Sequence, residues 1–99
     1  MKGTAAVLWT LHGRVHAGRL ELVHGRLELT ARGAALSIPL SSIEQFGIAR
    51  EAANRLNGLA VLGVTLPDGD VIRIASLQGT GVLHELAGVL APAVAAAGG

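Results

Sequence analysis

The chain has 99 residues, of which 51% are hydrophobic and 15% are charged, and its eight basic residues nearly balance seven acidic ones. This length corresponds to one domain with a single core, and we expect residues 1–97 to form it, with residues 98–99 as a flexible tail. The scattered basic residues and the scarcity of aromatics exclude an ordinary nucleic-acid-binding domain. The lack of cysteine excludes disulfides and thiolate sites. No apolar run reaches the ~20 residues that span a bilayer, and we expect a cytoplasmic protein.

The first predicted element is a strand over residues 5–11, a segment rich in β-forming residues. Gly13 and Gly18 follow it, and they predict a bend or bulge before the next strand.

A β-hairpin is predicted over residues 20–29, because His24-Gly25 separates two segments in which apolar and charged residues alternate. With these two residues in the turn, each apolar residue of one strand faces an apolar residue of the other. The predicted pairs are Leu22 with Leu27 and Leu20 with Leu29 on the core side, and Glu21 with Glu28 on the solvent side.

Short strands are predicted through the rest of the sheet. Residues 32–34 form a turn, and the strand over 35–38 ends or lies at an edge because Pro39 has no N–H for a ladder. Residues 41–42 turn the chain into a strand over 43–48, and residues 49–58 form a connection. Strands over 59–66 and 71–75 are joined by the turn residues 67–70, with Val64, Leu66, Ile72 and Ile74 facing inward.

The last predicted element is a helix that starts with Thr80 as its N-cap. Leu83, Leu86, Val89 or Leu90, and Val94 recur at helical spacing and form its core face. Pro92 is expected to kink or end this helix.

The fold class that follows is mainly β (α+β): a bent antiparallel sheet or partly open barrel of about seven strands, capped by one C-terminal helix. Four segments carry a resemblance to a known family: Gly18-Arg19-Leu20-Glu21-Leu22, Arg26-Leu27-Glu28-Leu29-Thr30, Ile38-Pro39-Leu40-Ser41-Ser42-Ile43 and Leu83-His84-Glu85-Leu86. Over nearly its whole length the chain resembles the bacterial PH-like (pleckstrin-homology/GRAM-like) superfamily. The resemblance implies binding of a protein, a peptide or a phosphoinositide.

A candidate anion or lipid contact lies between the first strand and the hairpin. His12, Arg14 and His16 alternate and would share one face of a continuous strand, and Arg19 follows them. Lipid-binding relatives carry a cluster of Lys and Arg here, whereas this chain has only two arginines. A metal site normally needs three or four ligands, so two histidines predict none.

The candidate protein interface comes from two strands that are apolar on both faces and must be covered on both. It comprises Leu8, Trp9, Leu59 and Val61, and the second cover could be another subunit. We therefore expect a non-enzymatic binding or assembly module that acts through protein–protein contacts or self-association as a homo-oligomer. The alternative is a peripheral module for an anionic lipid or phosphate ligand.

Catalytic chemistry is not indicated by any motif in the chain. No Gly-x-Ser-x-Gly elbow is present, and turn or strand positions explain the serines. Gly79-Thr80-Gly81 lacks the lysine of a phosphate loop. We expect no enzyme activity, no cofactor and no small-molecule substrate.

Overall fold

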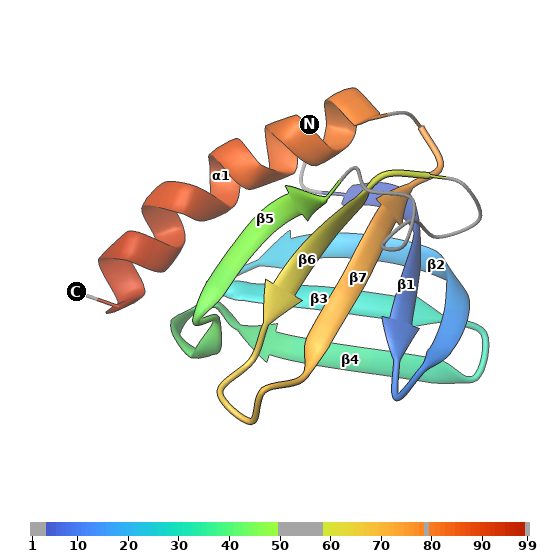
Figure 1. Cartoon of the computed structure of the whole chain (residues 1–99), viewed down its shortest axis with the longest axis horizontal. Helices are drawn as coiled ribbons and strands as arrows, with labels where there is room; N and C mark the ends of the chain where they lie inside the picture. The colour runs from blue at the N-terminus through green and yellow to red at the C-terminus, as the bar shows by residue number, and fades with distance from the viewer. Residues whose placement is uncertain (1–3, 50–58, 79, 99) are drawn as a thin grey trace.

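The computed structural model describes residues 4–49, 59–78 and 80–98 (Figure 1). Strands and one helix account for most of them. The elements, in chain order, are β1 (Thr4–Leu11), β2 (Arg14–Val23), β3 (Arg26–Ala31), β4 (Ala34–Pro39), the 3-10 turn η1 (Leu40–Ser42), β5 (Gln45–Ala49), β6 (Val61–Thr65), β7 (Val71–Ser76) and α1 (Thr80–Gly98). The connection predicted over 49–58 lies almost wholly outside the described residues.

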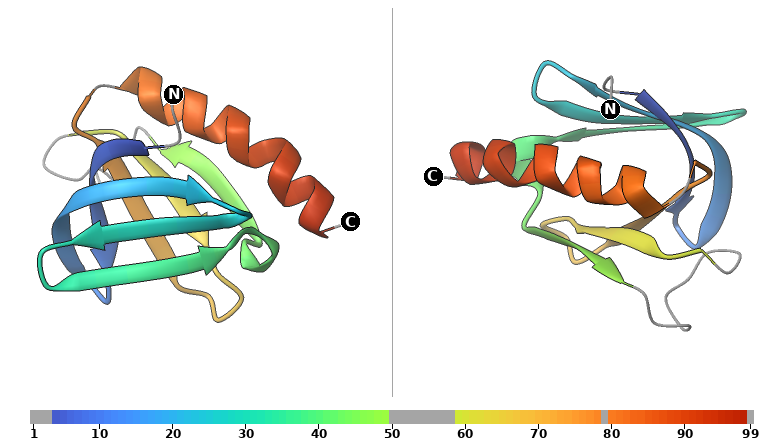
Figure 2. Two further views of the ribbon diagram at one scale, coloured as in Figure 1. Left: turned by 180° about the vertical axis from the view of Figure 1, so that it is seen from behind. Right: turned by 90° about the horizontal axis from the view of Figure 1, so that it is seen from above.

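All seven strands form one antiparallel sheet with the order β4-β3-β2-β1-β7-β6-β5. The sheet bends so that β2, β3 and β4 form one layer and β5, β6 and β7 another, with β1 and the curved β2 joining them at one side (Figure 2). Helix α1 lies across the open side and contacts η1, β5, β6 and β7. The predicted fold class, a mainly β domain closed by a C-terminal helix, is confirmed.

The predicted hairpin is confirmed in turn and register. His24 and Gly25 have φ angles of 46° and 77°, as a two-residue turn between twisted strands requires. The residue pairs are as predicted. Leu20 pairs with Leu29 and Leu22 with Leu27 on the core side, and Glu21 pairs with Glu28 on the solvent side.

The bend predicted between the first strand and the hairpin is a tight turn at Gly13, and no bulge interrupts the strand at Gly18. Residues 14–23 form one continuous strand, and β1 turns directly into it through His12 and Gly13, with φ angles of 51° and 79°. These angles match those of the His24-Gly25 turn, so the same dipeptide makes the same kind of turn twice. The repeated dipeptide was the signal that the sequence interpretation missed.

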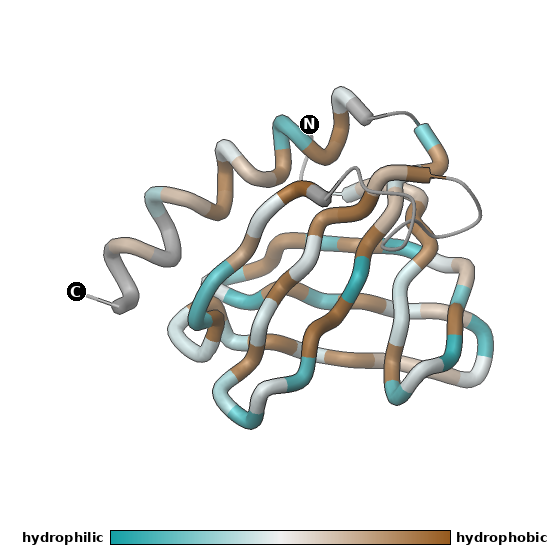
Figure 3. Tube along the Cα trace, viewed as in Figure 1, coloured by the Kyte–Doolittle hydropathy of each residue, from teal (hydrophilic) through white to brown (hydrophobic). Residues whose placement is uncertain are grey.

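The core lies between the two layers of the bent sheet and under α1. Apolar and polar residues alternate along most strands, which Figure 3 shows as alternating brown and teal. Trp9, Leu20, Leu27, Leu29, Leu62, Val64 and Ile74 are fully buried there, and Ile38 and Ile72 nearly so. Leu66, predicted to face inward, is partly buried against this cluster.

Helix α1 presents Leu83, Leu86 and Leu90 to this core, all of them buried. Val89 is about half exposed, so the structure selects Leu90 as the core residue of that pair. Thr80 is the first helical residue. Pro92 does not end the helix, which continues to Gly98. Of the two outcomes predicted for Pro92, a kink or an end of the helix, the end is therefore wrong.

We expect Pro92→Ala to raise the stability of the protein by about 1–3 kcal/mol, since proline is about 3 kcal/mol worse than alanine inside a helix and the site is near a helix end. Thermal unfolding followed by circular dichroism at the helical minimum measures this gain. The exposed Val89→Ala in the same helix is the control, for which we expect a change within about 0.5 kcal/mol. A lower unfolding temperature for Pro92→Ala would show that the proline is required where it stands.

Candidate functional site

The four residues predicted to contact an anion do not share one face in the structure. His12 lies in the β1–β2 turn and not in a strand. Arg14 and His16 alternate with Leu20 on the inner side of β2, whereas Arg19 pairs with Ala6 and belongs to the outer side. Of the three residues expected on one face, Arg14 and His16 share it, whereas the turn removes His12. Arg19, which was expected to follow them, lies on the opposite side because side chains alternate along a strand.

His16 is further engaged with the core. Its ring lies 4.9 Å from that of Trp9, centroid to centroid, with the planes tilted by 39°. The imidazole is partly buried in this contact, which leaves Arg14 as the exposed member of the inner-face pair.

The residues predicted as a protein interface are covered within the chain itself. Trp9 is fully buried in the main core, where its indole Nε1 donates to the carbonyl of Thr30 at 3.2 Å. On the outer face, Leu8 and Val61 form a second buried cluster with Ala75, and Leu59 packs against it. Leu8, Trp9 and Val61 are therefore buried, and Leu59 partly buried, within the single chain.

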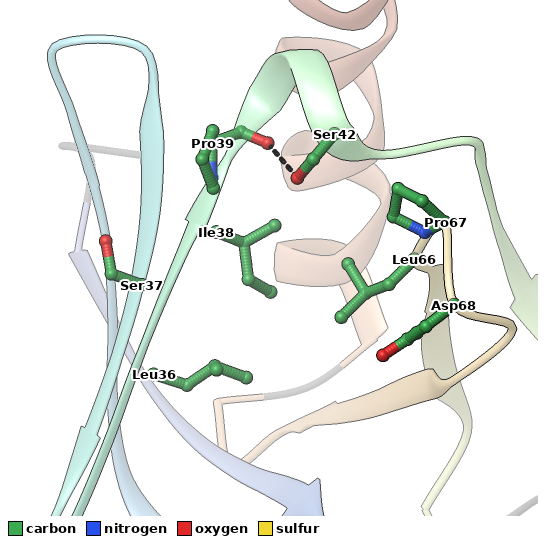
Figure 4. A pocket seen from close by; sticks show the side chains of 8 residues that line it. All are labelled: Leu36, Ser37, Ile38, Pro39, Ser42, Leu66, Pro67 and Asp68. Atoms are coloured by element: carbon green, nitrogen blue, oxygen red, sulfur yellow. Dashed lines mark hydrogen bonds between the residues drawn. The ribbon is translucent and has the colours of Figure 1, made fainter.

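A cavity of ≈ 290 Å³ opens between β4 and the turn that joins β6 to β7. Figure 4 shows side chains from the two layers facing each other across it, with Leu36 and Ile38 of β4 on one side and Leu66 and Asp68 on the other. Most of the lining side chains are apolar. The full lining is Leu36, Ser37, Ile38, Pro39, Ser42, Leu66, Pro67 and Asp68.

The wall on the β4 side is held in place by local hydrogen bonds. Pro39 ends the strand and η1 turns the chain, with the Ser42 hydroxyl donating to the Pro39 carbonyl at 2.8 Å. The Leu40 N–H donates to the carbonyl of Gly25 at 2.9 Å, which ties this corner to the β2–β3 turn. The wall is therefore preformed.

The opposite wall is the β6–β7 turn, which is equally well ordered. Asp68 Oδ1 accepts the N–H of Asp70 at 3.0 Å, an Asx turn of the kind that aspartate favours. Leu66 N–H donates to the Asp70 carbonyl at 2.9 Å, and Gly69 takes a φ of 91°. This turn holds Leu66 and Asp68 at the mouth of the cavity.

Strand β4 is an edge of the sheet, because among the strands that the structure describes it pairs with β3 alone. In antiparallel strands, residue pairs that exchange hydrogen bonds alternate with pairs that do not. Ala31 and Ala34 flank a two-residue turn and therefore form a hydrogen-bonded pair, as does every second pair after them. The hydrogen bond from the Leu40 N–H to the Gly25 carbonyl agrees with this alternation. Ala35 and Ser37 consequently direct their N–H and carbonyl groups away from β3. No side chain of β4 is charged, so it lacks the charges that usually protect an edge from pairing with another strand.

The mouth of the cavity is acidic. Asp68 lines it and Asp70 is in the same turn, and both are exposed. Exposed Glu44 lies close by, since its N–H donates to the carbonyl of Thr65 at 2.9 Å. Arg26 is engaged on the outer face, where its Nε lies 2.8 Å from Ser37 Oγ and 3.4 Å from Glu28 Oε1.

Across the described parts of the chain, no group of three or more His, Asp or Glu side chains is placed to hold a metal ion. Within residues 4–49, 59–78 and 80–98, no helix has both the length and the hydropathy needed to cross a membrane.

The sequence matches no family model, and no curated protein matches it. A solved structure is similar in fold: the C-terminal domain of an unknown protein from Leishmania infantum. It aligns with a TM-score of 0.65 at 18% identity, covering 88% of this chain and 80% of that domain. At this identity the similarity concerns the fold alone, a seven-stranded antiparallel sheet with a C-terminal helix, which is consistent with a PH-like fold.

The cavity was not foreseen from the sequence. Its lining comes from residues 36–42 and 66–68, two segments that were predicted only as a strand end and a turn. The one available signal was the pair of prolines, Pro39 and Pro67, each ending a strand segment. Proline at a strand end is common, and it does not indicate that two such ends face each other.

Proposed function

We propose that this protein is a non-enzymatic module of the bacterial PH-like superfamily that binds another protein, and that it accepts an extended segment of this partner alongside β4. The observation that carries the proposal is an open apolar cavity beside an uncharged edge strand. The bent seven-stranded sheet and its terminal helix support the assignment to the superfamily.

In peptide recognition of this kind, the backbone and the side chains of the peptide have different roles. An added strand gains affinity from main-chain hydrogen bonds, and pockets that take alternate side chains give specificity. Here, Ala35 and Ser37 supply the outward N–H and carbonyl groups, and the cavity below Leu36 and Ile38 supplies the pocket. Both walls of the cavity are already hydrogen-bonded, so little ordering is needed on binding.

The cavity is poorly suited to catalysis. Two serines line it, and their hydroxyls donate elsewhere: that of Ser42 to the Pro39 carbonyl and that of Ser37 to Glu28 Oε1. Among the described residues that line it, the single carboxylate, Asp68, holds its own turn together and no histidine accompanies it. A nucleophile with an adjacent base is what such chemistry requires.

The alternative of an anionic lipid or phosphate ligand has less support. Of its four residues, His12 is in a turn, Arg19 is on the outer face and His16 packs on Trp9. Arg14 alone offers little charge to a membrane, where each basic residue near the surface contributes about 1 kcal/mol. Sedimentation with anionic vesicles tests this alternative directly, and we expect no salt-sensitive binding.

We expect Ala35→Pro to abolish binding of peptides selected on the wild-type protein from a phage-displayed library of random dodecapeptides. Proline removes one outward N–H, and it is tolerated on an edge strand where that N–H faces solvent. Ala35→Val is the matched control, because it keeps the N–H and favours a strand. Fluorescence anisotropy with a labelled selected peptide measures the affinities.

Nuclear magnetic resonance of the wild-type protein gives a second test that does not depend on the folding of the proline variant. The amide signals of Ala35 and Ser37 should shift and exchange more slowly with solvent when the peptide binds. Peptides that bind Ala35→Pro as well as wild type, or that shift only signals elsewhere, contradict the proposal. A dimer in light scattering that Ala35→Pro dissociates would identify a second copy as the occupant of this edge and would also contradict it.

A further inference from the structure

We infer that the segment bound along β4 places an apolar side chain in the cavity and a lysine or arginine, two residues away, against Asp68. This inference rests on the proposed function and names the chemistry of the partner. It follows from three features of the site: the size of the cavity, its position under the inner face of β4, and the acidic groups at its mouth.

The size of the cavity limits what enters it. At ≈ 290 Å³ it lies just below the range of about 300–1,000 Å³ for small-molecule pockets. It therefore suits one or two side chains. Leu36, Ile38 and Leu66 line it with aliphatic carbon, so the side chain that fits is apolar, and burial of its surface supplies most of the specificity.

The position of the cavity sets the spacing of the two recognised residues. In a strand added beside β4, alternate residues face the same side of the sheet and lie about 6.6 Å apart. One such residue enters the cavity beside Leu36 and Ile38, and the next on that face lies at its mouth. Figure 4 shows the Asp68 carboxylate on the wall opposite β4 and facing the cavity. A long lysine or arginine stem spans this gap along the apolar wall while its charged end reaches the carboxylate.

The charges around the mouth favour a cation at that second position. Asp68 lines the cavity and is exposed, and exposed Asp70 and Glu44 lie near it in the chain and through backbone hydrogen bonds. Arg26 belongs to the outer face and is already paired with Glu28. An acidic residue of the ligand at this position would meet the Asp68 carboxylate, which disfavours it, whereas a basic residue is attracted.

The test is to repeat the dodecapeptide selection on wild type, Asp68→Asn and Asp70→Asn, and then to titrate synthetic peptides from the wild-type pool. Asp68→Asn removes the charge but keeps the Oδ1 acceptor for the Asp70 N–H, so the turn is preserved. We expect wild-type peptides to share an apolar residue with Lys or Arg two positions away, and Asp68→Asn to keep the apolar preference and lose the basic one. Asp70→Asn, the matched control, should retain both.

We expect a modest loss of affinity when the charge of Asp68 is removed and a large loss when the apolar residue of the peptide is replaced. Because Asp68 is exposed, its loss should weaken a basic peptide about 2- to 5-fold, and about 0.5 M salt should erase the difference. Replacing the apolar residue of the peptide by alanine should weaken binding about tenfold or more.

The outcomes separate this inference from the function on which it rests. Peptides without a basic residue, bound equally by wild type and Asp68→Asn but not by Ala35→Pro, overturn the inference and leave the proposed function standing. Failure of wild type to select any peptide, or equal binding by Ala35→Pro, overturns both.

Discussion

Gly18→Ala is expected to destabilise the protein by about 3 kcal/mol or more, a large part of the 5–15 kcal/mol that holds a typical domain together. A Cβ atom at this position would lie 1.8 Å from the Thr30 carbonyl oxygen and 2.8 Å from Ala31 Cα. Both atoms belong to the backbone of β3, so relief requires the two strands to separate. Urea unfolding followed by the emission of the single tryptophan measures the loss.

Gly47→Ala is the matched control for this substitution. Gly47 is also in a strand, β5, but a Cβ there meets nothing within 4 Å. We expect its stability to change by about 0.5 kcal/mol or less, or to rise slightly because alanine restricts the unfolded chain. If the two variants unfolded at the same urea concentration, β2 and β3 would lie farther apart at Gly18 than they do in the structure.

Trp9→Ala is expected to cost about 3–5 kcal/mol, the range for removing a buried aromatic side chain. Trp9 is fully buried and hydrogen-bonded to Thr30. Trp9→Phe keeps most of the packing and should lose about 1–2 kcal/mol through the missing hydrogen bond and volume. Thermal unfolding followed by far-UV circular dichroism measures both, because the variants lack the only tryptophan.

The same experiment separates a core role for Trp9 from the interface role that the sequence suggested. Val15→Ala, on an exposed side chain of β2, is the control, with an expected change within about 0.5 kcal/mol. If Trp9→Ala left stability unchanged but altered the mass of the protein in light scattering, Trp9 would belong to an interface and not to the core.

The local structure of the β2–β3 hairpin could be predicted because its determinants are adjacent in sequence. His24-Gly25 permits the positive φ angles of a tight turn, and alternation then fixes which residues face each other. The same chemistry at His12-Gly13 was not recognised, and one strand was therefore divided by a bend. Along the helix, periodicity identified the core face, but the helix continues beyond Pro92 to Gly98.

The interface hypothesis shows what the pattern of apolar residues along a strand predicts and what it does not. Apolar residues on both faces of β1 and β6 correctly indicated burial on both sides. They did not indicate what provides that burial. Leu8, Val61 and Ala75 come from three strands that are neighbours only in the folded sheet, so their mutual contact could not be deduced from any one segment.

The sequence by itself determined the β2–β3 hairpin with its register, the inward residues of most strands and the C-terminal helix, because these depend on residues within a few positions of one another. The tertiary structure alone decided that Leu8, Val61 and Ala75 meet in a buried cluster, and that β4 and the β6–β7 turn enclose a cavity. These features arise when the sheet bends and brings residues 36–42 beside residues 66–68. Contacts across such a separation depend on the packing of the whole chain, which no local pattern encodes.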